Sequence, residues 1–160
     1  MIEELFLNYR GFLQHGIIFG LTIWAFLRGE VPEKLAGSIL SAMVAALYVF
    51  AWVDAPMDDH GGVIMSYFVI DLGAFLALVP LAMRANRMYP IWLLAAQLIS
   101  LAMQFQRELL PSIDPIAYYV LIRGPSWVQV LALAIGLYLH RRRLRRFGPY
   151  RSWRTRSRRS

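Results

Sequence analysis

Long apolar stretches separated by short polar loops make up most of the chain. A helix that crosses a lipid bilayer needs roughly 20 predominantly apolar residues, because about 30 Å of hydrocarbon is crossed at about 1.5 Å per residue. Five stretches meet or approach this length, and we predict helices over residues 5–27, 35–53, 63–83, 90–106 and 116–139. The predicted fold is therefore all-α, a polytopic transmembrane bundle of about five helices.

The fifth predicted helix is interrupted by the sequence Arg123-Gly124-Pro125. The part after Pro125 has about 14 residues, or about 21 Å of helix, which is too short to span a bilayer alone. Proline inside a helix also removes one backbone hydrogen bond. We therefore expect a discontinuity here, with residues 116–124 either crossing as half of a broken helix or lying in the interface.

Composition points to lipid as the solvent, since 58% of the 160 residues are hydrophobic. A soluble domain of this size buries a smaller apolar share. Glu3 and Glu4 occupy the place where a signal peptide needs positive charge, so we expect the first helix to be retained. The sequence has no cysteine, which excludes disulfides and thiolate chemistry.

Charge is distributed unevenly and predicts an orientation. Residues 141–160 carry ten arginines and no acidic residue, whereas residues 1–140 carry seven basic and ten acidic residues. Short loops rich in Lys and Arg lie on the cytoplasmic side of a membrane. On the side of this tail the predicted loops contribute four more basic residues, Arg28, Lys34, Arg84 and Arg87. We therefore predict the amino terminus outside and an arginine-rich cytoplasmic tail over residues 141–160.

The tail predicts a membrane partner. A basic residue close to an anionic leaflet contributes about 1 kcal/mol of attraction. We expect headgroup contacts from Arg141, Arg142, Arg143, Arg145 and Arg146. Nucleic acid is not an expected partner, because nothing in the tail would read a base sequence. Arginine outnumbers lysine 16 to 1, which favours a bacterial inner membrane as the location.

Polar side chains inside the predicted spans form the candidate site, a cluster of His15, Asp71, Gln97, Gln104 and Arg123. An ionisable group in the bilayer costs about 2.5 to 3.5 kcal/mol on insertion scales, so each needs a partner or a purpose. Asp71 and Arg123 are predicted at similar depths, and we expect them to form an ion pair. Gln129 and Ser126 lie on the side of Arg123. The cluster either joins the helices by hydrogen bonds or lines a hydrated cavity.

Small residues predict how the first two helices pack. Gly16 and Gly20 form a GxxxG pattern in the first helix, and Gly37, Ser41 and Ala45 form a similar row in the second. Small side chains at this spacing let two helix backbones approach closely. We therefore expect the first two helices to meet on these faces.

Enzyme, metal and cofactor chemistry find little support in the sequence. No catalytic motif is present, and the acidic loop from Asp54 to His60 matches no recognised metal-ligand spacing. The three histidines are not predicted at one level, so we expect neither a metal nor a haem.

We expect a non-enzymatic accessory or scaffold subunit of a membrane assembly, which binds another membrane protein or a second copy of itself. The alternative is a small oligomeric channel or transporter that uses the buried polar cluster. A haem- or quinone-binding electron-transfer subunit is a third class.

Overall fold

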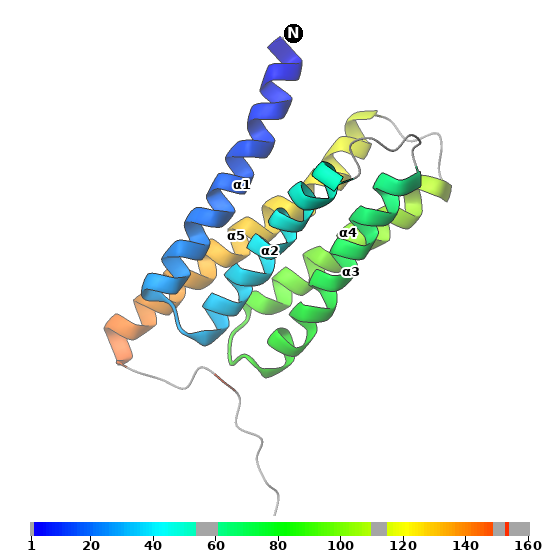
Figure 1. Ribbon diagram of the computed structural model, residues 1–160. Coiled ribbons are helices and arrows are strands. Elements are labelled where there is room, and N and C mark those ends of the chain that lie inside the picture. The colour runs from blue at the N-terminus through cyan, green and yellow to red at the C-terminus, as the bar shows by residue number, and fades with distance from the viewer. Residues whose placement is uncertain (1, 54–60, 110–114, 149–152, 154–160) are drawn as a thin grey trace, which may run out of the picture.

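The computed structural model describes residues 2–53, 61–109, 115–148 and Trp153, with side chains described for 11–53, 67–104, 124–148 and 153. This part of the chain forms five helices: α1 (Ile2–Arg28), α2 (Val31–Val53), α3 (Gly61–Arg84), α4 (Tyr89–Leu109) and α5 (Pro115–Phe147). The predicted all-α class and the five helices are confirmed. The helices run up and down in turn, each antiparallel to the next (Figure 1).

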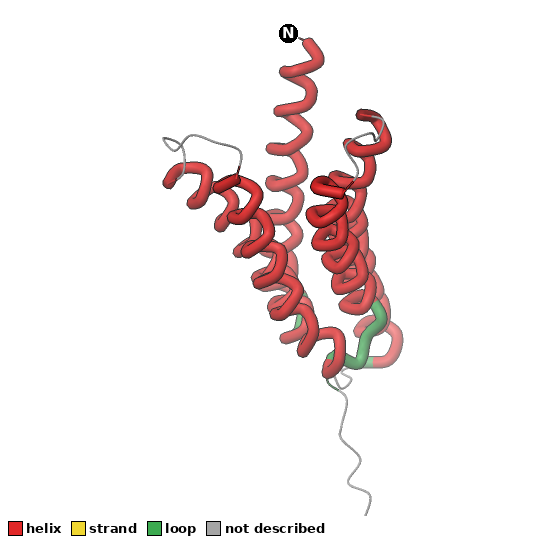
Figure 2. The backbone as a smooth tube through the Cα atoms, turned by 90° about the vertical axis from the view of Figure 1, so that its right-hand side faces the viewer, coloured by secondary structure: helices red, strands yellow, loops and turns green. Residues whose placement is uncertain are grey.

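The helices form a closed ring. α1 packs on α2, α2 on α3, α3 on α4 and α4 on α5, and α5 returns to α1 while also contacting α2. Figure 2 shows the helices closer together at the end where α3 joins α4 than at the opposite end. The bundle therefore has two unlike halves. We call the half next to the α3–α4 connection the basic half, and the other the opposite half.

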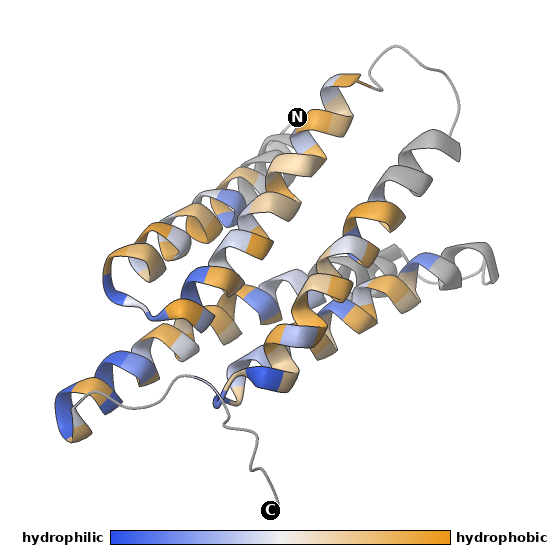
Figure 3. Cartoon of the chain, turned by 60° about the horizontal axis from the view of Figure 1, so that its bottom comes forward, coloured by the Kyte–Doolittle hydropathy of each residue, from blue (hydrophilic) through white to orange (hydrophobic). Residues whose placement is uncertain are grey.

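The apolar core fills the basic half. Its fully buried side chains include Leu40 of α2, Leu78 of α3, Leu93 of α4 and Leu133 of α5. Hydrophilic residues gather at the adjoining end of the bundle, around the last turns of α5 and the α3–α4 connection (Figure 3). Trp153 packs against the same core and pairs with Ala85 in an isolated bridge.

A buried ion-pair cluster closes the basic half. Arg87, in the α3–α4 connection, pairs with Glu33 of α2 and with Glu30, the latter at 2.7 Å between Nη2 and Oε2. The Arg87 side chain is 4% exposed and that of Glu33 is fully buried. Glu33 also accepts a hydrogen bond from the Glu30 backbone N–H, as in a capping box at a helix start. These contacts join the α1–α2 connection to the α3–α4 connection.

α5 differs from its prediction at both Pro125 and its end. The helix passes through Pro125 without interruption, so the expected discontinuity is wrong. Proline lacks the backbone N–H donor, so the helix loses one hydrogen bond at this position. A helix tolerates this loss where neighbouring helices pack around it, and α5 packs against α4, α1 and α2. α5 also continues to Phe147 instead of ending near Leu139, so the predicted tail begins as helix. Gly148 then ends it with a φ of 72° and a hydrogen bond to the Leu144 carbonyl.

α1 and α2 meet on one of the two predicted small-residue rows. A Cβ added at Gly37 would lie 3.1 Å from Thr22 Oγ1 and 3.2 Å from Thr22 Cα. The Thr22 hydroxyl also lies 2.7 Å from the Ser41 hydroxyl and donates to the Gly37 carbonyl. Gly16 and Gly20 are instead exposed, with nothing within 4 Å of an added Cβ. The prediction is therefore right for Gly37 and Ser41 of the α2 row and wrong for the GxxxG row, and the third residue of the α2 row, Ala45, is exposed.

Much of the outer surface is apolar. Two described helical segments, Val31–Val53 and Tyr67–Arg84, are long and apolar enough to cross a membrane by length and composition. Large apolar side chains such as Trp52, Leu76 and Met83 are exposed on them. The segment Tyr89–Gln104 is apolar but shorter.

Replacing Gly37 with leucine tests the α1–α2 contact. The larger side chain must push the two backbones apart, and overpacking of this kind costs about 1 to 3 kcal/mol. We expect Gly37→Leu to lower the thermal unfolding midpoint of the detergent-purified chain. Gly16→Leu is the matched control within the monomer, and we expect it not to lower the midpoint, because nothing lies within 4 Å of an added Cβ there. Equal effects of the two substitutions would contradict the contact.

The Arg87–Glu33 pair makes a second prediction. Removing one partner leaves a buried charge without its counterion, which costs about 3 to 5 kcal/mol, whereas an apolar pair can be tolerated. We expect Arg87→Met and Glu33→Met each to lower the unfolding midpoint sharply and the double variant to recover much of the loss. A double variant as unstable as the sum of the single variants would show that the pair is not coupled.

Candidate functional site

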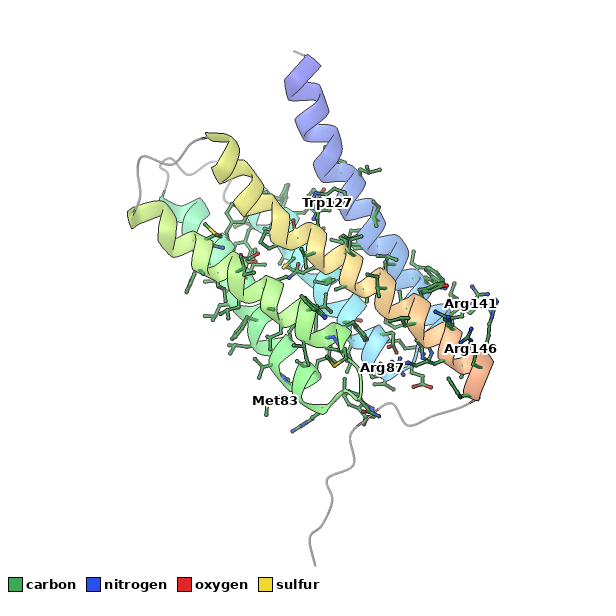
Figure 4. All side chains as sticks on the ribbon, turned by 180° about the vertical axis from the view of Figure 1, so that it is seen from behind. Met83, Arg87, Trp127, Arg141 and Arg146 are labelled. Atoms are coloured by element: carbon green, nitrogen blue, oxygen red, sulfur yellow. The ribbon has the colours of Figure 1, made fainter. Side chains whose placement is uncertain are left out.

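The opposite half of the bundle contains a cavity of about 490 Å³. Every helix contributes to its lining, so the cavity lies between the helices, and it is partly open to the outside. The polar lining residues are Gln14, His15, Tyr48, Tyr67, Asp71, Gln97, Ser100, Gln104, Ser126 and Gln129. Figure 4 labels Trp127 of α5, next to the lining residue Ser126, and shows it far from Arg87 and Arg141 at the basic end.

Asp71 of α3 is the centre of the polar lining. Gln97 Nε2 donates a hydrogen bond of 2.9 Å to Asp71 Oδ1, and Gln104 Nε2 donates one of 2.5 Å to Oδ2. Gln97 Nε2 also lies 3.1 Å from the Asp71 backbone carbonyl. Both carboxylate oxygens therefore have an amide donor from α4.

The hydrogen-bond chain continues to α5. Gln129 Nε2 donates to Gln97 Oε1, and both of these side chains are buried. Gln97 thus accepts from α5 and donates to α3, so three helices are joined through one amide. Gln97 and Gln104 donate to the Asp71 carboxylate and Gln129 donates to Gln97, an arrangement that stabilises a negatively charged carboxylate.

Helix periodicity explains why these side chains meet. Gln97 and Gln104 are seven residues apart, and Ser100 lies between them on the same face of α4. That face turns toward Asp71 and Gln129, and the rest of the helix carries exposed apolar residues such as Leu98 and Ile99. The polar row is therefore kept inside the bundle while the apolar surface of α4 faces outward.

The cavity wall formed by α1 and α2 has a different character. His15 Nδ1 lies 2.9 Å from the Tyr48 hydroxyl, and the two rings meet edge to face with centroids 5.4 Å apart. Gln14, one residue earlier, is buried. Apolar side chains complete this wall, among them Met43 and Leu47.

Four of the five predicted cluster residues line this one cavity. Asp71, Gln97 and Gln104 are joined by hydrogen bonds, and His15 lies on the wall formed by α1 and α2. The side chain of Arg123 is outside the described side chains, so the Asp71–Arg123 ion pair remains a prediction.

Some site residues were not predicted from sequence. Gln14 was missed. The apolar residues Ile18 and Ala25 follow it at spacings of four and eleven residues, which place all three on one helix face, and that face is buried. Tyr48 looks like a residue of an interfacial aromatic belt in sequence. Arg87 and Glu33 look like ordinary loop charges, and no local pattern reveals that they are buried together.

The predicted headgroup-binding arginines extend the basic end. Arg141, Arg142, Arg143, Arg145 and Arg146 are all exposed on the last two turns of α5. They are far from the cavity, as the labelled Arg141 and Arg146 show (Figure 4). They therefore form a separate surface.

The cavity combines a carboxylate, amides, hydroxyls and an imidazole with an apolar remainder. Among the described residues no group of three His, Asp or Glu side chains could hold a metal ion. The arrangement provides several hydrogen-bonding groups for a small solute in a partly open cavity, which is typical of a binding site. Comparison with protein-family models, curated proteins and solved structures gives no match to this chain.

Proposed function

We propose that this chain is an integral membrane protein that binds a small solute in the Asp71 cavity and acts as a small transporter or channel. The observation that carries the proposal is the contrast between the two halves of the bundle. One half is filled by apolar side chains and closed by the Arg87–Glu33 pair. The other contains a cavity that is lined by all five helices and has a cluster of polar groups around Asp71.

The exposed apolar surface supports the membrane location. In the most apolar part of each segment that is long enough to cross a membrane, few residues are buried inside the bundle. The buried share is 22% for Val31–Val53 and 28% for Tyr67–Arg84. The core helix of a soluble protein would be mostly buried, because its apolar residues would otherwise face water. Lipid around the bundle would solvate this surface without cost.

The charge distribution supports one orientation. Positive residues at the end of α5 would lie at the cytoplasmic face, where anionic headgroups attract them. Arg141, Arg142, Arg143, Arg145 and Arg146 are exposed and available for that contact. The closed half would then face the cytoplasm and the cavity would lie in the outer half. A bacterial inner membrane is the location that we propose.

The cavity supports solute binding over a purely structural role for its polar residues. Interhelical hydrogen bonds alone do not require a cavity beside them, and closely packed helices would leave little space there. A volume of about 490 Å³ is within the range of small-molecule sites, about 300 to 1,000 Å³. Gln97 and Gln104 also hold Asp71 in place at the cavity wall, and Gln129 supports Gln97.

The accessory-subunit function expected from the sequence is the second candidate. Its support is the outward face of α1, where Gly16 and Gly20 are exposed beside Phe12, Phe19 and Ile23. Small residues at this spacing suit close contact with another helix. The proposed partner is a second membrane protein or another copy of this chain, and such a contact is compatible with solute binding.

Filling the cavity tests the proposed function. Ser100→Phe places an aromatic ring in the lining of α4, next to Gln97 and Gln104. A ligand that binds the folded state raises its unfolding midpoint. We expect members of a panel of small metabolites to raise the midpoint of the detergent-purified wild-type chain and not that of Ser100→Phe. Leu98→Phe, on the outer face of α4, is the control and should respond as wild type.

Two results would contradict this function. One is a panel in which no compound raises the wild-type midpoint. The other is an equal response of wild type and Ser100→Phe.

A further inference from the structure

The charge of the cavity lining indicates the class of ligand. Asp71 is the one carboxylate among the described lining residues, and these include no lysine or arginine. The groups that donate to it, Gln97 and Gln104, are neutral amides. Amide donors lower the cost of an anion in an apolar environment without neutralising its charge. The described part of the cavity therefore has an electrostatic preference for a positive ligand.

The surroundings of the carboxylate also suit a cation. Tyr48 and Tyr67 add aromatic rings to the lining, and aromatic π-systems attract cations. The thioethers of Met43 and Met103 are polarisable and adapt to ligands of different shape. His15 is engaged through Nδ1 with the Tyr48 hydroxyl.

Size and apolar lining exclude a bare inorganic ion as a good fit. About 490 Å³ is far more than one cation needs, and the space beyond Asp71 is lined by apolar residues such as Val44, Leu47 and Ile18. An apolar lining is favourable only for a ligand that carries apolar surface of its own. A ligand that fits both parts has a positive head and an apolar body.

We infer that the cavity binds an organic cation, an amine or quaternary ammonium group on an apolar body, with the charged nitrogen at Asp71. The inference rests on the proposed solute-binding function and specifies its ligand class. In this arrangement the ligand supplies the counterion for Asp71, and Gln97 and Gln104 orient the carboxylate toward it. Asp71 is thus the residue that determines charge selectivity.

Three matched probes test this inference on the full-length, detergent-purified chain: phenyltrimethylammonium, its neutral carbon analogue tert-butylbenzene, and benzoate. We expect phenyltrimethylammonium to bind at least about tenfold more tightly than tert-butylbenzene in calorimetry, and benzoate to bind more weakly than either. The same order should appear in the shift of the unfolding midpoint.

Variants at Asp71 separate its charge from its structural role. Asp71→Asn keeps the shape and removes the charge, so it should lower the affinity for phenyltrimethylammonium at least about tenfold and leave that for tert-butylbenzene unchanged. Asp71→Glu keeps the charge and should retain the preference for the cation even if the bundle is less stable. Ser100→Ala is the control at the same cavity wall and should preserve the preference.

The outcomes distinguish the ligand class from the proposed function. Equal or tighter binding of tert-butylbenzene or benzoate, or a cation affinity that Asp71→Asn does not change, would overturn the cation assignment and leave solute binding intact. A chain that binds none of the probes and no member of the metabolite panel would overturn both.

Discussion

A carboxylate inside an apolar helix bundle must find hydrogen-bond donors within the protein, and this constraint organises the cavity half of the molecule. Asp71 meets it with Gln97 and Gln104, two amides one heptad apart on α4, and Gln129 supports Gln97 from α5. The register of three helices therefore depends on one acidic side chain. Because both amides are neutral, neither of them is a counterion for Asp71, and the inferred cation would take that place.

In the basic half the buried carboxylate has a charged partner. There Arg87 neutralises Glu33 directly, and apolar side chains fill the remaining space. Thr22 lies against Gly37 nearby, so α1 and α2 approach closely where the bundle is closed. In the orientation proposed from the arginines of α5, a bundle closed at one half and hollow at the other would give a solute access from one side of the membrane only. The proposed transport cycle would then require the Arg87 cluster to open, with this cluster as its barrier on the cytoplasmic side.

The sequence predicts features that follow from periodicity and composition. Five apolar stretches gave the five helices, and the spacing of Gln97 and Gln104 placed them on one face. The sequence also placed both glutamines in one cluster with Asp71, although it did not give their hydrogen bonds. The Arg87–Glu33 pair was not predictable, because it joins two connections more than fifty residues apart in the chain. Pro125 was expected to interrupt α5, because the local rule does not include the support of surrounding helices. The exposed position of Gly16 and Gly20 shows that a short motif does not identify the helix face that packs.

The sequence contains no cysteine, so single cysteines can be introduced as probes. They test directly whether one half of the bundle contains a solvent-accessible cavity while the other half is closed. Single cysteines can replace Ser100 and Ala51 in the cavity lining, and Leu93 and Ala36 in the packed half. A small membrane-impermeant thiol reagent is then added to intact cells. We predict rapid modification at positions 100 and 51 and none at 93 and 36. Protection of all four cysteines, or modification of the packed positions as fast as the cavity positions, would contradict it.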